Sequence, residues 1–303
     1  QKRTQNLQDV PIVVTTVNAQ QLQDAGVKDI KDLTVVTPGL TVTTTSSSAI
    51  TTARIRGVGT VGDNVGLESS VGVVIDEVYR PRNGVAFSDL GELDRVEVLK
   101  GPQGTLFGKN TTAGVINVIT KRPSFTFGAN SEATFGNLNT AGFAISVTGP
   151  LVEDKLAGRL FVAARHRDGY YDRVARDTND QNYYTGRGQL LWRPSDDVEV
   201  NFAADYTKRR EGCCGAVQMI NGPTAAIVLA LAPGGIASPV NTDNLRDYGN
   251  RSDVKEIEDK GAQATATWDL HALGDATLTS VTAYRDWKQA GGGDVDWTGA
   301  DIL

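Results

Sequence analysis

The most informative part of the chain is a β-rich stretch at residues 93–120, which reads LDRVEVLKGPQGTLFGKNTTAGVINVIT. Its turns carry closely spaced glycines, and it ends in a short apolar strand just before Lys121-Arg122-Pro123. Glycine lets the backbone adopt positive φ and pass close to other backbone, which an ordinary strand does not need. The stretch therefore predicts strands at residues 95–99 and 114–120, connected by glycine-built turns.

The composition narrows the class of protein. A chain of 303 residues has room for two domains, and its net charge of -6, without a Lys/Arg cluster, argues against a nucleic-acid partner. Its 33 glycines and single methionine suit strands and turns better than helix bundles. The longest apolar run, residues 225–232, is far shorter than the about 20 residues of a membrane-spanning helix. No signal-peptide pattern begins at Gln1, so an exported form has already lost that segment. A membrane protein without apolar helices would have to be a closed β-barrel.

The two cysteines, Cys213 and Cys214, are adjacent, and the two histidines, His166 and His271, lie far from them in sequence. Adjacent cysteines within one chain form either a strained vicinal disulfide or two free thiols. A disulfide ring that stiffens a loop in an oxidising compartment is one interpretation, and a copper or redox role is the other. Zinc is disfavoured because no ligand set surrounds the pair. The sequence predicts neither a metal site nor a cofactor.

The first 122 residues predict a small α+β globule. Asn18 can cap a helix over residues 19–24, with Gln21 reaching back as in a capping box and Gly26 ending the helix. A second helical turn is expected over residues 28–33. Strands are expected at residues 40–44, 52–56, 71–75, 95–99 and 114–120.

From about residue 131 the pattern changes to long alternation of apolar and polar residues. Even positions are apolar and odd positions mostly polar over residues 198–207, and residues 262–270 alternate in the same way. On residues 156–164 the polar face holds Arg159 but is interrupted by Phe161 and Ala163, and the faces of residues 276–285 cannot be assigned. Strands of about 10 residues with period two suit transmembrane β-strands, although a soluble β-sandwich shows the same alternation.

The lengths of the connections favour the barrel over the sandwich. Short connections at residues 149–155, 194–197 and 271–275 alternate with long ones at residues 168–181 and 211–260. This is expected when one rim of a barrel faces the periplasm and the other faces outside. Aromatic residues near the strand ends suit interfacial girdles, and they are Tyr170, Tyr171, Tyr183, Tyr184, Trp192, Tyr206, Trp268, Tyr284 and Trp287.

The number of strands sets the expected domain organisation. About seven barrel strands can be found, whereas single-chain barrels start at about eight and plugged transporters use about 22. An open sheet would leave bare edges in lipid. We therefore expect residues 1–122 to form one domain, 123–130 a linker and 131–303 the incomplete N-terminal strands of a barrel that continues in a longer protein.

Several separate blocks of the first domain resemble the plug domain of TonB-dependent outer-membrane receptors. Besides residues 93–120, they are residues 9–15, 32–40, 55–57 (Ile-Arg-Gly) and 73–79, in the order of that family. The resemblance implies an α+β plug domain followed by antiparallel transmembrane strands of a 22-stranded barrel. It also implies a place in the outer membrane of a Gram-negative bacterium, in contact with its lipid.

The resemblance implies active transport, most often of an iron-siderophore. Cobalamin, haem, oligosaccharide and other metal chelates remain open as substrates. A receptor or scaffold for carbohydrate uptake, signalling or adhesion is the alternative, and a passive porin is disfavoured because porins lack a plug before the first strand. The implied partner is TonB with its inner-membrane ExbB/ExbD motor, acting through a TonB box expected just before Gln1.

The resemblance also marks residues for gating and for ligand binding. The plug signature comprises Arg56, Gly57, Arg95, Glu97, Lys100, Gly101, Pro102, Gly104, Gly108, Gly114 and Asn117. Its charged members are expected between plug and barrel wall, where a buried charge needs a partner. The alternative is that Arg95 and Glu97 pair inside the plug. Ligand contacts are expected from the loops at residues 58–68, 79–87 and 104–108, with Arg82, Asn83 and Phe107 as candidates. Loop solubility or local packing is the alternative for each of these three.

Two enzyme-like patterns fail on inspection. Residues 104–109 are similar to a phosphate-binding loop, but Gln103 stands where the first glycine belongs and Asn110 replaces the Ser/Thr that holds magnesium. Asp294 and Asp296 suggest a calcium loop whose other ligands are missing. The sequence therefore predicts no enzyme.

Overall fold

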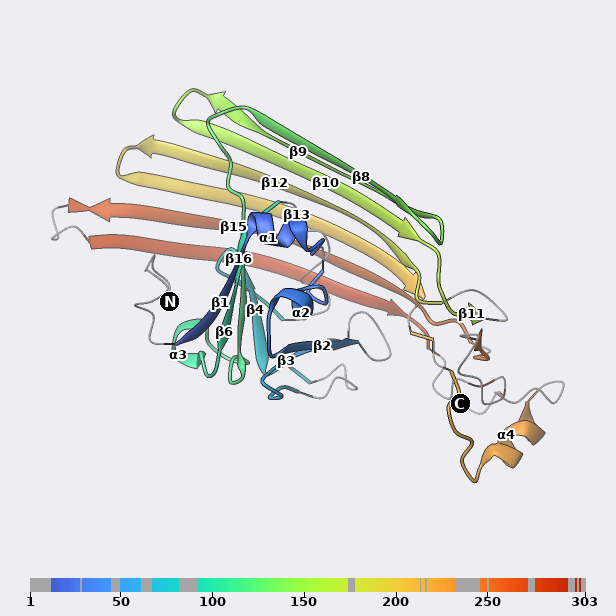
Figure 1. Ribbon diagram of the computed structural model, residues 1–303. Helices are drawn as coiled ribbons and strands as arrows, with labels where there is room; N and C mark the ends of the chain where they lie inside the picture. Colours follow the sequence, from blue (N-terminus) through green and yellow to red (C-terminus); the bar gives the residue numbers. More distant parts are fainter. Residues whose placement is uncertain are drawn as a thin grey trace.

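The chain folds into a small N-terminal domain that lies against one face of a long seven-stranded sheet, which we call the wall (Figure 1). This computed structural model describes residues 12–27, 29–44, 50–60, 67–81, 92–173, 178–212, 214–215, 217–232, 246–249, 251–271, 276–293, 298 and 300.

The N-terminal domain is built on a five-stranded mixed sheet in the order β1-β6-β7-β4-β5. The strands are β1 (Val13–Asn18), β4 (Val71–Ile75), β5 (Val78–Arg80), β6 (Leu93–Lys100) and β7 (Gly114–Thr120), and a separate hairpin pairs β2 (Leu40–Thr44) with β3 (Thr51–Ile55). β7 runs parallel to β4 and antiparallel to β6. The strands expected at residues 40–44 and 114–120 are confirmed, and β6 is longer than expected by two residues before and one after.

The first helix, α1 (Ala19–Asp24), begins with the predicted capping box. The Asn18 side chain accepts from the backbone N–H of Gln21 at 2.9 Å, and the Gln21 side chain accepts from the N–H of Asn18 at 3.0 Å. The second helix begins only at the end of the predicted range, residues 28–33. It is α2 (Leu33–Val36), and a turn precedes it, in which the backbone N–H of Asp32 donates to the carbonyl of Asp29. The short third helix is α3 (Gly104–Phe107).

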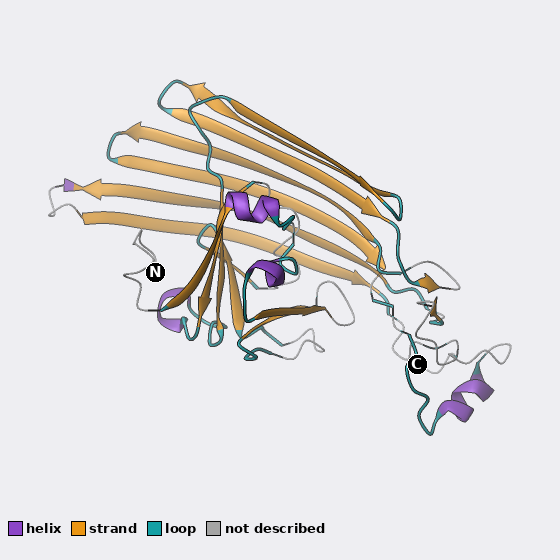
Figure 2. Ribbon diagram, in the orientation of Figure 1, coloured by secondary structure: helices purple, strands orange, loops and turns teal. Residues whose placement is uncertain are grey.

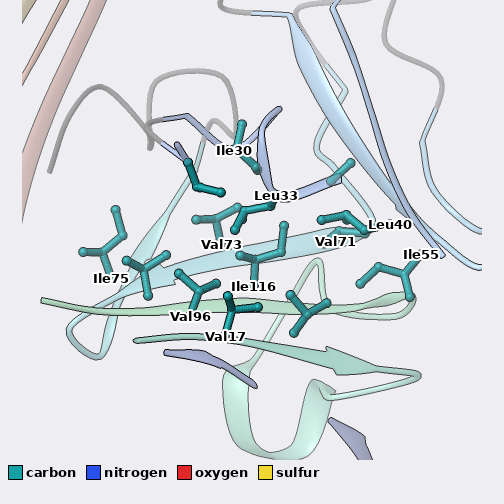
Figure 3. Close-up of a cluster of buried hydrophobic side chains, with 14 of the residues drawn as sticks. Val17, Ile30, Leu33, Leu40, Ile55, Val71, Val73, Ile75, Val96 and Ile116 are labelled. Atoms are coloured by element: carbon teal, nitrogen blue, oxygen red, sulfur yellow. The ribbon is translucent and has the colours of Figure 1, made fainter. Parts of the chain in front are cut away.

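The core of this domain is aliphatic and belongs to the domain alone. The side chains of Val73, Val96, Ile116 and Val17 from the sheet face Ile30 and Leu33 of the helical segment (Figure 3). A second cluster on the other face of the sheet joins Val74, Leu99 and Val115 to the half-buried Phe107. Among the described residues, neither cluster contains a residue of the wall.

One glycine of the opening motif allows a close backbone contact. Gly114 has φ +152°, and a Cβ there would lie 2.3 Å from the Leu99 carbonyl oxygen and 2.6 Å from Ile55 Cδ1. No L side chain fits this position without moving the neighbouring strand β6 or the β3 side chain.

We expect Gly114→Ala to destabilise the N-terminal domain by about 2–3 kcal/mol, because overpacking and an unfavourable φ act together. Urea denaturation of the full protein, followed by a plug-specific probe, measures this loss. Gly104→Ala is the matched control, since Gly104 lies in the same glycine-rich stretch with open space around its Cβ position. Equal midpoints for the two variants would contradict the assignment.

The wall is a single sheet in which each strand pairs with its neighbours in sequence order, apart from two short strands in the long connections. Its members are β8 (Gly128–Gly136), β9 (Thr140–Val152), β10 (Leu156–Arg167), β12 (Gln181–Ser195), β13 (Val198–Gly212), β15 (Val254–Leu270) and β16 (Ala276–Gly291). All pairs are antiparallel. Within the described residues, the seven alternating strands form one continuous sheet rather than two sheets packed on each other, so the sandwich alternative is wrong (Figure 2).

The two faces of the wall differ as the alternation predicted. Leu160, Leu190 and Phe202 are 58%, 42% and 43% exposed on the outer face. Their neighbours Arg159, Gln189 and Ala203 are buried on the face toward the N-terminal domain. Phe161 and Ala163, which interrupted the polar pattern, are buried on that inner face as well.

The long connections are shorter than expected, and they contain structure. β13 and β15 extend into residues 211–212 and 254–260 of the predicted 211–260 loop, since strand pairing continues where charged residues end the apolar alternation. β11 (Asp172–Arg173) pairs in parallel with β14 (Arg246–Asp247), which ties the two long connections together. The apolar run at 225–232 forms α4 (Ala225–Leu231), apart from the wall at one end of the molecule (Figure 2). Within the described residues, no helix is long and apolar enough to cross a membrane.

Candidate functional site

The tip of the β4–β5 hairpin brings an acidic residue to the wall. Its two-residue turn, Asp76-Glu77, has φ +46° and +71°. In two-residue hairpin turns, residues with positive φ are most often Asn-Gly. A non-glycine pair in the left-handed region costs free energy, and such outliers persist where the surroundings impose them. The surroundings here are the end of β7 and the wall.

The wall meets this hairpin with one cross-strand row of residues on its inner face. In register, the row runs Arg187 on β12, Asp205 on β13, Gly261 on β15 and Arg285 on β16. A Cβ at Gly261 would lie 2.6 Å from Cδ of Arg285. The missing side chain thus lets Arg285 lie across β15 and reach Asp205 on the strand beyond.

Six charged residues, three Asp and three Arg, form what we call the charge cluster: Asp76, Arg80, Arg187, Asp205, Asp259 and Arg285. Arg187 bridges the two parts, with Nη2 2.6 Å from Oδ2 of Asp76 and Nη1 3.3 Å from Oδ2 of Asp205. Arg285 lies 2.6 Å from Oδ1 of Asp205 and 2.6 Å from Oδ2 of Asp259. Arg80 at the end of β5 contacts both of these wall carboxylates more loosely, at 3.8 and 4.0 Å.

The charge cluster is buried and electrically balanced. Side-chain exposure ranges from 3% at Arg187 to 15% at Asp76. Burial lowers the pKa of Arg80 to about 10, against the opposing effect of Asp205, so the guanidinium keeps its charge at neutral pH. Buried charges of this kind are tolerable only when paired, and removal of one partner is costly.

Neutral groups extend the contact between hairpin and wall. Gln263 of β15 donates to the backbone carbonyl of Asp76 at 3.1 Å, and Gln189 of β12 donates to the Thr120 hydroxyl at 3.3 Å. Thr120 in turn donates to the Asp76 carboxylate through its backbone N–H at 2.9 Å and its hydroxyl at 2.7 Å. The end of β7 therefore holds Asp76 in place from within the N-terminal domain.

A second carboxylate, Glu92, joins the N-terminal domain to the other end of the wall. It accepts from Ser146 of β9 at 3.1 Å, and it contacts Arg159 of β10 and Asn130 of β8. Beside it, a cavity of about 460 Å³ separates α1 from strands β8–β10. Contact with the wall is thus dense at the charge cluster and open beside α1.

The predicted charged residues lie elsewhere. Arg95 pairs with Glu97 and Asp94, each at 2.7 Å, and Glu97 accepts from Asn117 at 3.0 Å. Lys100 donates to the carbonyl of Pro38 at 2.8 Å. These contacts stay inside the N-terminal domain, which is the alternative given for Arg95 and Glu97, and Arg56 is exposed. Their part in gating stays a prediction.

Of the three predicted ligand residues, only Phe107 is among the residues that the structure describes. Arg82, Asn83 and Cys213 lie outside the described residues. Phe107 packs against the cluster of Val74, Leu99 and Val115, which matches the local-packing alternative for it. Cys214 is disulfide-bonded.

The charge cluster itself was not predicted as a site. The alternation of the wall strands places Arg187, Asp205, Asp259 and Arg285 on the inner face, and charged residues on an otherwise small and polar face were the available signal. Nothing local marks Asp76 and Arg187 as partners, because they are 111 residues apart in sequence.

Comparison with known proteins identifies the N-terminal domain. The family model described as TonB-dependent Receptor Plug Domain matches residues 6–115. The chain is 28% identical over 208 residues to the ferripyoverdine receptor of Pseudomonas aeruginosa, covering 65% of this chain and 23% of that protein. It is 29% identical over 194 residues to the pesticin receptor of Yersinia enterocolitica, covering 63% of this chain and 28% of that protein. The chain thus spans about a quarter of the length of these relatives.

Solved structures extend the likeness to the wall. The ferric yersiniabactin uptake receptor of Yersinia pestis matches with a TM-score of 0.74 and 21% identity, over 92% of this chain and 41% of that chain. The alcaligin outer-membrane receptor of Bordetella pertussis matches with a TM-score of 0.66 and 20% identity, over 93% of this chain and 40% of that chain. These matches show the fold of plug and partial barrel together. The family that matches the N-terminal domain is not enzymatic, in agreement with the expectation that the chain is not an enzyme. The N-terminal domain is therefore a TonB-dependent receptor plug domain, and the strands that follow it have the fold of the partial β-barrel in solved outer-membrane receptors.

Proposed function

We propose that the protein takes up an iron-siderophore or a related metal chelate across the outer membrane, with the plug as a gate that TonB opens. Relatives named ferripyoverdine receptor and ferrioxamine receptor support the substrate class. The plug is taken as residues 1–122, and the linker predicted at 123–130 is shortened to 123–127, because the first wall strand β8 begins at Gly128 rather than at 131.

The observation that carries the gating role is the chemistry of the plug–wall contact. Plug and wall meet through ion pairs, amides and hydroxyls at Asp76, Arg80, Thr120 and Glu92. Both apolar cores of the plug stay within it. Separating an apolar interface costs about 25 cal/mol for each Å² exposed, whereas polar groups exchange their partners for water. A plug held in this way can leave the wall and return without exposing its core.

The order of strands favours opening from the N-terminal side. β1 is an edge strand that pairs only with β6 in the described sheet, and it is joined directly to α1. A pull from a TonB box before Gln1 reaches β1 first, and α1 borders the cavity of about 460 Å³ next to β8–β10. We propose that the transport path opens there. Arg82, Asn83 and Phe107 remain the proposed ligand contacts, and the signature residues Arg56 to Asn117 remain proposed for gating.

Uptake by whole cells tests the proposal. Cells that carry the complete receptor are expected to accumulate ⁵⁵Fe-labelled siderophores, and deletion of TonB is expected to abolish the accumulation. Labelled oligosaccharides run in parallel test the carbohydrate alternative. Uptake that persists without TonB, or accumulation of neither kind of substrate, would contradict active transport.

A further inference from the structure

We propose that the β4–β5 hairpin inserts a charge-neutral pair, Asp76 and Arg80, into a wall site that stays balanced when the plug leaves. To the charge cluster the hairpin supplies one carboxylate, Asp76, and one guanidinium, Arg80, whereas its other carboxylate, Glu77, is exposed and is not a member of the cluster. The wall supplies two of each: Asp205, Asp259, Arg187 and Arg285. The formal charge of the site is therefore zero with the hairpin present and zero with it absent.

Each wall charge of the charge cluster keeps a partner on the wall itself. Without the hairpin, Arg187 still lies 3.3 Å from Asp205, and Arg285 still lies 2.6 Å from both Asp205 and Asp259. Gly261 makes this possible, because a side chain there would collide with Arg285 as it crosses β15. Movement of the hairpin thus leaves no unpaired charge among the wall residues of the charge cluster.

The departing hairpin is also satisfied. Asp76 keeps the two hydrogen bonds from Thr120, which belongs to the plug and moves with it. Arg80 holds its wall carboxylates at 3.8 and 4.0 Å, the longest contacts of the cluster, and water can replace them. Of the ion pairs of the charge cluster within hydrogen-bond distance, only Asp76–Arg187 breaks.

This arrangement bears on the cargo, so the inference rests on the proposed function. Once the hairpin has moved, the exposed row presents two acidic and two basic groups that neutralise one another. A wall with surplus arginine would retain an anionic chelate, and one with surplus aspartate would repel it. A balanced row does neither.

A thiol-accessibility assay on the complete receptor in lipid tests the charge balance without substrate or TonB, so its outcome is independent of the transport proposal. The reporter is Ala203→Cys, since Ala203 is 4% exposed on the inner face of β13, in the register row of Gln189 and Gln263. Maleimide labelling in mild urea reports how often the plug uncovers the wall. Cys214 is disulfide-bonded and does not compete for the reagent.

Asp76→Asn and Arg80→Gln are each expected to raise the labelling rate about tenfold, because each leaves one surplus charge in the plugged site. The double variant restores neutrality, and its rate is expected to stay well below the about hundredfold product of the two singles. Asp94→Asn is the control, since its pair with Arg95 is exposed and lies within the N-terminal domain; it should leave the rate unchanged. Rates that multiply in the double variant would overturn the proposal.

The temperature at which the barrel loses its resistance to SDS gives a second readout. The hairpin double variant is expected to match the unmodified receptor, because the wall is balanced alone. Asp205→Asn is expected to lower this temperature clearly, since it leaves surplus positive charge on the wall in both states. An equal drop for the hairpin and wall variants would show that the wall depends on the plug for its charge, contrary to the proposal.

Discussion

The variant Asp205→Asn is expected to destabilise the receptor by about 3–5 kcal/mol, the cost of removing one partner from a buried network of charges. Asp205 is the centre of the charge cluster, since Arg80, Arg187 and Arg285 all contact its carboxylate. An amide keeps the shape of the side chain but leaves three guanidinium groups facing two carboxylates. Yield of folded receptor in outer membranes and its midpoint in a urea titration measure the loss.

The matched control is Glu256→Gln on the neighbouring strand β15. Glu256 pairs with Lys208 at 2.6 Å, which resembles the cluster in distance, but the two side chains are 43% and 32% exposed. Exposed ion pairs contribute about 0–1 kcal/mol, so this variant should fold almost normally. If both variants lose stability equally, burial is not what makes the cluster matter.

The sequence was sufficient to predict those structural features that depend on interactions between residues close together in the chain. The capping box at Asn18 and Gln21 needs only residues three apart, and β7 is an apolar run that ends at the sharp change in composition before Lys121. The misplaced α2 shows the limit. Its four residues, Leu33–Val36, have no side-chain cap and two β-branched valines, so packing of Leu33 in the core decides where the helix forms.

The charge cluster could not be predicted from local sequence patterns, because its residues come from distant parts of the chain. Periodicity could assign Arg187 and Asp205 to the inner face of the wall, and the family resemblance could indicate that a plug fills that side. Neither could say that the Asp76-Glu77 turn meets this row, because the pairing depends on how two separately folded units dock. The three-residue strand β5, which carries Arg80, is too short for a periodic signal.

The most direct test of the central claim is to tie the plug to the wall and measure uptake. Thr120→Cys and Gln189→Cys replace side chains that are in contact across the interface at 3.3 Å, and a short bis-maleimide is expected to link them. Because the proposed transport requires the plug to move along this wall, the linked receptor should lose siderophore uptake. The single-cysteine variants treated with the same reagent should retain it. Linking Gln189→Cys to Ala203→Cys, which are register partners within the wall, should also leave uptake intact. A linked Thr120–Gln189 receptor that imports at the unlinked rate would contradict a gating plug held at this site.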